Sequence, residues 1–306
     1  MSDDGRTETA RLVTLDALRG FAVMGILAMN IVAFAMPELA YISPRAYGGD
    51  SAADMTAWTL SFLFIDGKMR GLFSILFGAS MLLVIDRAAA SGKNPASVHY
   101  RRMAWLAVFG LCHFFFIWWG DILFLYATVG CIAFQFREWE ARRLIKWAIG
   151  LFALGVLLMT LQFGSQLVLA TTTDHPGAPA GMAEAGAKNR AAYAEVSGQI
   201  AKEVALYRGP YFPILSKRLG NAIELPEMVM MNLLETLPLM MIGMALFRNG
   251  FLTGAWDAAA YWRTARRWLP PGLILTALVA SIMARAEFDT LVSLNAFIAW
   301  VQPAPP

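Results

Sequence analysis

The sequence predicts an all-α fold, a polytopic transmembrane helical bundle with roughly seven to eight spans and a partly helical extracytoplasmic loop. The first observation is composition, because 58% of the 306 residues are hydrophobic and only 15% are charged. The second is a mean hydropathy of +0.53, which is typical of a chain that lies in lipid. The third is that apolar runs long enough to cross a bilayer alternate with short basic segments.

The spans are placed by length, flanking charge and helix breakers, because a run that is apolar on every side shows no helical period. A shorter helix at 52–65, interfacial or buried, precedes the second span, and the apolar segment 290–301 is too short to cross comfortably. The outer loop has helical spacing at Tyr193, Val196, Ile200 and Val204. The predicted spans are 13–35, 71–86, 101–119, 121–136, 144–170, 226–247 and 268–284.

We divide the chain into an N-terminal transmembrane bundle with the polar motifs (1–170), an extracytoplasmic cap loop (171–225) and a C-terminal transmembrane part (226–306). Every second connection is rich in arginine and lysine, which short cytoplasmic loops carry in excess. The N-terminus is therefore expected on the cytoplasmic side and the cap loop on the outer side. Asp16 and Arg19 interrupt the first apolar run, which favours a retained helix over a cleaved signal peptide.

Ionisable side chains inside a span are costly, so each is a functional candidate once simpler explanations are weighed. Asp16 and Arg19 share one helical face near the cytoplasmic end of the first span. A structural explanation is available for both charges. Thr14 can cap the helix, Asp16 can stabilise its positive end, and Arg19 can reach to the interface. The alternative is an anion-binding cytoplasmic mouth.

The segment IDGKMRGLFSILFGAS places Asp66, Lys68 and Arg70 at the outer end of the second span. Charges at a helix end in the interface need no function, and Ser74 and Gly78 have the small-xxx-small spacing that lets helices pack closely. Lys68 and Arg70 are equally suited to hold a carboxylate or a phosphate. Both interpretations stay open.

The segment GLCHFFFIWWGDILFLYA sets His113 and Asp121 in apolar and aromatic surroundings. His113 ends the outward span and Asp121 begins the return helix, so the two can meet across the hairpin. A carboxylate behind an imidazole fixes its tautomer and stabilises the imidazolium, which is the usual arrangement of a general base. The structural alternative is a hydrogen bond that pins the hairpin, with Asp121 capping the return helix.

Glu235 is a carboxylate inside the sixth span, shortly before the helix breaker Pro238. Such a group usually faces the bundle interior, where a raised pKa or a basic partner such as Arg70 settles its charge. Proton relay and structural pairing are both open. The other two histidines lack a ligand set, and both cysteines lie in apolar segments, so no metal site or disulfide framework is predicted.

Five segments in order resemble the YeiB-like family of bacterial inner-membrane proteins, a family with a domain of unknown function. They are LDALRGFAVMGILAMNI, IDGKMRGLFSILFGAS, GLCHFFFIWWGDILFLYA, YRGPYF and LPLMMIGMALFRNGFL, and the likeness covers nearly the whole chain. This family is similar to the transmembrane acyltransferases such as heparan-alpha-glucosaminide N-acetyltransferase, in which an acyl group from cytosolic acyl-CoA reaches a sugar across the membrane.

The resemblance implies functional roles for Asp16, Arg19 and Gly20, for Lys68, Arg70 and Gly78, and for His113, Gly120 and Asp121. The acetyltransferase has its catalytic histidine in the first luminal connection, whereas residues 36–60 contain none, so His113 would serve instead. Family members continue past the seventh span, whereas this sequence ends at Pro306. A truncated, a natively short and a differently ended chain all stay open.

The main hypothesis is an acyltransferase of the bacterial inner membrane that moves an acyl group from cytoplasmic acyl-CoA to an envelope glycan or lipid. It assigns His113 and Asp121 to catalysis, Lys68, Arg70 and Glu235 to substrate binding, and Asp16, Arg19 and Gly20 to acyl-CoA. Expected partners are membrane lipids and that acceptor, with no nucleic acid and no metal; a homodimer stays open. The alternatives are a transporter that conducts protons or substrate along Glu235, Asp121 and His113, and a structural or signalling subunit.

Overall fold

The computed structural model describes residues 4–172 and 180–300, and every regular element in these ranges is a helix. The predicted all-α fold is thereby confirmed. Short 3₁₀ segments lie at Pro44–Tyr47, Phe134–Phe136 and Asn221–Ile223, and a π-helical turn at Thr160–Gly164. The α-helices are α1 (Asp4–Ala35), α2 (Glu38–Ile42), α3 (Ala52–Phe64), α4 (Lys68–Ala90), α5 (Pro95–Phe116), α6 (Leu123–Ala133), α7 (Ala141–Met159), α8 (Ser165–Thr172), α9 (Ala180–Gly198), α10 (Ile200–Tyr207), α11 (Tyr211–Gly220), α12 (Glu224–Arg248), α13 (Ala258–Arg285) and α14 (Thr290–Trp300).

Five segments of the described chain are long and apolar enough to cross a membrane, which makes the protein a multi-pass helical membrane protein. Two predicted spans are not among them. α5 carries His99, Arg101 and Arg102 in its first turns, and α6 is only 11 residues long. The five segments are Thr14–Ala35, Ala52–Ala90, Ala141–Val168, Tyr211–Arg248 and Ala258–Arg285.

The chain forms two compact units, each assembled from stretches that are distant in sequence. Unit 1 contains the chain up to Ile26, Lys68–Leu154 and Arg218–Trp268. Unit 2 contains Leu27–Gly67, Gly155–Lys217 and the chain from Leu269 onward. Helices α1, α7 and α13 each begin in unit 1 and continue into unit 2.

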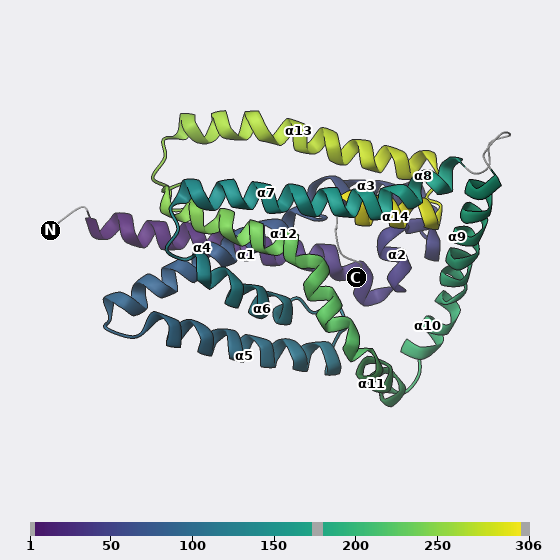
Figure 1. Cartoon of the computed structure of the whole chain (residues 1–306), viewed down its shortest axis with the longest axis horizontal. Helices are drawn as coiled ribbons and strands as arrows, with labels where there is room; N and C mark the ends of the chain where they lie inside the picture. The colour runs from purple at the N-terminus through teal and green to yellow at the C-terminus, as the bar shows by residue number, and fades with distance from the viewer. Residues whose placement is uncertain (1–3, 173–179, 301–306) are drawn as a thin grey trace. The chain divides into compact units, whose positions relative to one another are not determined.

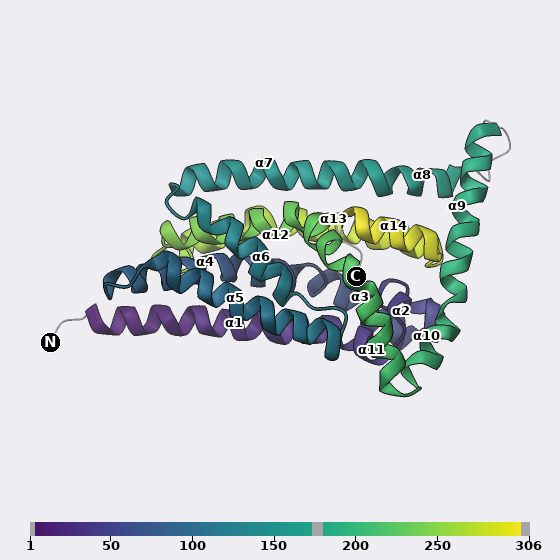
Figure 2. The same cartoon turned by 60° about the horizontal axis from the view of Figure 1, so that its bottom comes forward.

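The centre of unit 1 is a close packing of α4, α6 and α12, with α5 beside α6 (Figures 1 and 2). Glycines make the closest contacts. A Cβ at Gly78 of α4 would overlap the carbonyl oxygen of Met240, and a Cβ at Gly243 of α12 would overlap that of Ile75. The two backbones therefore touch, which fixes the side chains that α4 and α12 present to each other.

Unit 2 buries α14 almost completely, so this short apolar helix is a core element of the unit, in keeping with its being too short to cross. Phe62 of α3 and Phe297 of α14 are the largest fully buried side chains of unit 2. α14 packs on α8 and on the π-helical turn, where the Trp300 indole donates to Thr160 Oγ1 at 3.2 Å. The helical spacing expected in the outer loop is found in α9 and α10.

Candidate functional site

The last turn of α5 and the start of α6 bring His113 and Asp121 together. His113 Nδ1 lies 3.0 Å from Asp121 Oδ1. The second carboxylate oxygen accepts the backbone N–H of Phe124 at 2.9 Å. Asp121 therefore caps α6 and contacts the imidazole at the same time, and both interpretations of this segment predict that contact.

The pair is unequally exposed. Only 1% of the Asp121 side chain is accessible, against 32% for His113. A carboxylate on Nδ1 favours the tautomer with the proton on that nitrogen, which leaves Nε2 as the acceptor. The buried partner fixes the ring, and the ring itself remains accessible to a ligand.

Two glycines explain how the hairpin closes around this pair. A Cβ at Gly110 would overlap the backbone nitrogen of Phe124 and reach 2.9 Å from Asp121 Oδ2, so only glycine admits the start of α6 there. A Cβ at Gly120 would overlap the indole ring of Trp118. That ring in turn lies edge-on to the His113 imidazole, with centroids 6.3 Å apart. Residues 117–122 lie outside the helices, so the connection is longer than the predicted spans 101–119 and 121–136 allow.

A second polar pair joins α4 to α12. Arg70 Nη2 donates to Glu235 Oε2 at 2.8 Å, and its Nη1 donates to Asn232 Oδ1 at 3.0 Å. Both charged side chains are sealed, at 7% and 8% exposure. Arg70 is thus the basic partner that the sequence suggested for Glu235, whereas Asn232 was not predicted.

The backbone of Arg70 is held as firmly as its side chain. Ser74 donates to the Arg70 carbonyl oxygen at 3.0 Å and lies 2.6 Å from the Tyr126 hydroxyl. Tyr126 is in α6, so this contact ties the pair to the helix that Asp121 caps. About two turns further along α4 and α12 lie Gly78 and Gly243, where the two backbones touch.

The third predicted group, on α1, is more exposed. Arg19 donates to Asp16 at 2.6 Å and to Ser80 of α4 at 2.9 Å through Nε. A Cβ at Gly20 would meet nothing within 4 Å. Arg19 is therefore engaged by α4, whereas Gly20 is not required by packing. Lys68 is the first residue of α4 and partly buried, two positions before Arg70.

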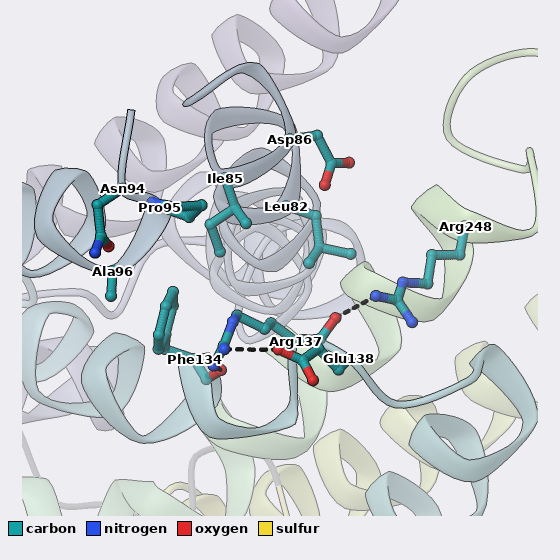
Figure 3. Close-up of a pocket in the computed structure, with 10 residues that line it drawn as sticks. All are labelled: Leu82, Ile85, Asp86, Asn94, Pro95, Ala96, Phe134, Arg137, Glu138 and Arg248. Atoms are coloured by element: carbon teal, nitrogen blue, oxygen red, sulfur yellow. Dashed lines mark hydrogen bonds and ion pairs between the residues drawn. The ribbon is translucent and has the colours of Figure 1, made fainter. Parts of the chain in front are cut away.

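Unit 1 also holds a pocket of about 470 Å³ where its basic connections gather. Figure 3 shows Leu82 and Ile85 of α4 facing Phe134 and Arg137 across it. Arg137 donates to the Phe134 carbonyl and to Glu138, and Arg248 donates to the carbonyl oxygens of Trp139 and Arg137. The sequence used such arginines only as signals of membrane orientation. It did not predict that Arg137 and Arg248 donate hydrogen bonds to backbone carbonyl oxygens of the connection between α6 and α7.

His99 is a core residue. It is fully buried, stacks on Phe134 and has Nε2 3.1 Å from the Gly130 carbonyl oxygen. Burial lowers the pKa of this imidazole, and the nearby Arg102 and Arg137 lower it further, so it is neutral near pH 7. Among the described residues no group of three or more histidine, cysteine or acidic side chains is placed to hold a metal ion.

Fold and site together define a multi-pass helical membrane protein with paired ionisable side chains inside its bundle. The chain is 31% identical to "Uncharacterized protein YeiB" of Escherichia coli K12 over 274 residues. This aligned region covers 89% of the chain and 63% of YeiB. It is 38% identical over 148 residues to "Uncharacterized protein YxaH" of Bacillus subtilis 168, covering 47% of this chain and 37% of YxaH. These relatives support the resemblance to the YeiB-like family.

A third relative is an uncharacterized 39.9 kDa protein of Bacillus acidopullulyticus, 33% identical over 149 residues, covering 49% of this chain and 39% of that protein. The chain spans less than two thirds of the length of the curated relatives that it matches. No family model matches the chain. No solved structure matches it either.

Proposed function

We propose that the protein is a membrane acyltransferase that moves an acyl group from acyl-CoA to a hydroxyl or amine of an envelope glycan or lipid. The observation that carries this proposal is the unequal His113–Asp121 pair, with an accessible imidazole and a sealed carboxylate behind it. We place the protein in the bacterial inner membrane with its N-terminus in the cytoplasm, since its basic connections gather at one end of unit 1.

In this mechanism His113 Nε2 removes the proton of the acceptor group as that group attacks the thioester carbonyl. A new ester or amide bond forms and the carbon–sulfur bond breaks. The proton then passes from the imidazolium to the departing CoA thiolate, so no other reactant is needed. Asp121 stabilises the imidazolium between these two transfers.

The remaining polar groups receive positioning roles. Lys68 at the start of α4 and the Arg70–Glu235 pair are assigned to binding the acceptor. Asp16, Arg19 and Gly20 are assigned to the CoA end, since Gly20 leaves space next to the helix there. The pocket of about 470 Å³ lies at the start of α5, at the opposite end of this helix from His113, so it is assigned to the CoA end of the donor and not to its thioester.

The test is transfer of label from radiolabelled acetyl-CoA into the lipid and glycan fraction of proteoliposomes that hold the full chain. His113→Ala should lower this turnover by about 100- to 10,000-fold, because a single positioned base supplies that much. The matched control is Cys112→Ala, since Cys112 is the exposed neighbour on the same helix. Equal turnover in the two variants would contradict the mechanism.

The sealed Arg70–Glu235 pair supports a second candidate function, because charged pairs inside membrane helices often mark ion or substrate pathways. A transporter of this kind would show counterflow of labelled substrate in the same proteoliposomes without any acylated product. Glu235→Gln should then abolish counterflow, and His113→Ala should lower it, because this function places both side chains on the pathway.

A further inference from the structure

Helix α11 exposes large apolar side chains and buries a charged one. Phe212 is 76% accessible and Leu219 53%, and Ile223, just after the helix, is 79% accessible. The buried side chains of α11 are Ile214 and Arg218, and Arg218 is only 7% exposed. α11 begins the candidate span Tyr211–Arg248, and exposed apolar side chains of this kind are suited to hydrocarbon surroundings.

Part of the Arg218 guanidinium is buried without a partner. Two of its nitrogens, Nε and Nη1, are sealed from solvent and have no hydrogen-bond partner among the residues that the structure describes. A buried donor that lacks an acceptor is costly, so these nitrogens favour a ligand that supplies one. Arg70, by contrast, is equally buried and is fully engaged by Glu235 and Asn232.

We propose that Arg218 binds the phosphate of a membrane lipid or of a lipid-linked acceptor. A planar guanidinium matches the oxygen spacing of phosphate, and a phosphate oxygen supplies the acceptors that the two sealed nitrogens need. The apolar side chains on the outer face of the same helix favour a ligand that arrives through the lipid phase. This Arg218 site rests on the proposed function and deepens it, since it makes the acceptor a phosphate-bearing lipid.

The neighbouring Lys217 offers a matched control. It is exposed and carries the same charge one position earlier on the same helix. A general electrostatic attraction between a basic helix and anionic lipid would depend on either residue. A site built around the buried guanidinium would depend on Arg218 alone.

The experiment measures binding of phosphatidylglycerol to the purified full chain in a maltoside detergent, by titration and by the lipid-induced rise in the unfolding temperature. Diacylglycerol with the same acyl chains serves as the probe that lacks phosphate. We expect phosphatidylglycerol but not diacylglycerol to stabilise the wild type, because a ligand that binds only the folded state raises its stability. Arg218→Gln should weaken binding at least about ten-fold, Lys217→Gln by less than about two-fold, and Arg218→Lys to an intermediate degree.

Equal binding by Arg218→Gln and Lys217→Gln would overturn the proposal, as would equal stabilisation of the wild type by diacylglycerol. Stabilisation by inorganic phosphate without any effect of phosphatidylglycerol would overturn the lipid as the source of the anion. If Arg218→Gln fails to fold, Arg218→Lys and the two lipid probes on the wild type still decide the outcome. His113→Ala should bind phosphatidylglycerol normally, so loss of acyl transfer and loss of the Arg218 site are separate results.

Discussion

Unit 1 contains two charged pairs that look alike in sequence and differ in construction. Arg70 and Glu235 are both sealed. Arg70 also donates to Asn232 Oδ1, and its carbonyl oxygen accepts hydrogen bonds from Ser74 and Tyr126. In the other pair Asp121 is sealed, whereas the imidazole of His113 is one-third accessible. Both charges of the first pair have hydrogen-bonded partners inside the bundle. The second pair leaves about a third of the histidine side chain accessible, and a general base needs such access to its substrate.

The largest effect should come from breaking the sealed pair. Arg70→Met leaves Glu235 buried without its cation, and removal of one member of such a pair costs about 3–5 kcal/mol. The free energy of unfolding, measured with the full chain in detergent, should fall by that amount.

The double variant Arg70→Met with Glu235→Leu is the control for this loss. It removes both charges and replaces them with apolar side chains, which often restores stability where the pair has only a structural role. Acyl transfer by a restored double variant would show that the sealed pair holds α4 against α12 without entering the reaction. Restored stability with no transfer would instead place Arg70 or Glu235 at the acceptor.

A smaller effect should come from Asp121→Asn, which sharpens the contrast with the sealed pair. The amide can still accept the Phe124 N–H but no longer carries the charge that stabilises an imidazolium. Turnover should fall at least about tenfold, because no charge then holds the tautomer or stabilises the imidazolium. The unfolding temperature should change less than in Arg70→Met; a larger drop would make Asp121 chiefly a structural cap.

Much of this arrangement could be predicted from the sequence, because local order determines it. His113 and Asp121 flank one hairpin, so their meeting follows from the short connection between two helices. For Glu235 inside an apolar run, the sequence left a raised pKa and a basic partner such as Arg70 as alternatives, and the structure shows the partner. Asn232 was missed, although it lies one helical turn before Glu235 and interrupts the same apolar run.

The rest depends on which faces of distant helices meet, and fully apolar runs have no period that would reveal those faces. The sequence therefore did not predict the backbone contact at Gly78 and Gly243, nor the engagement of Arg19 by Ser80. The predicted spans 101–119 and 121–136 correspond to α5 and to the shorter apolar helix Leu123–Phe136. They are not among the five long candidates, because α5 begins with charged side chains and α6 is short.

The smallest effect should come from the exposed Asp16–Arg19 pair on α1. It tests whether burial sets how much each of the three charged pairs contributes to stability. Asp16 is 69% accessible, and an ion pair so open to water contributes about 0–1 kcal/mol. Asp16→Asn should therefore leave the free energy of unfolding almost unchanged. If Asp16 serves the CoA end, the same variant should raise the KM for acetyl-CoA while kcat stays constant. An unchanged KM would remove Asp16 from the donor site and leave Arg19 with Ser80 as a contact between α1 and α4.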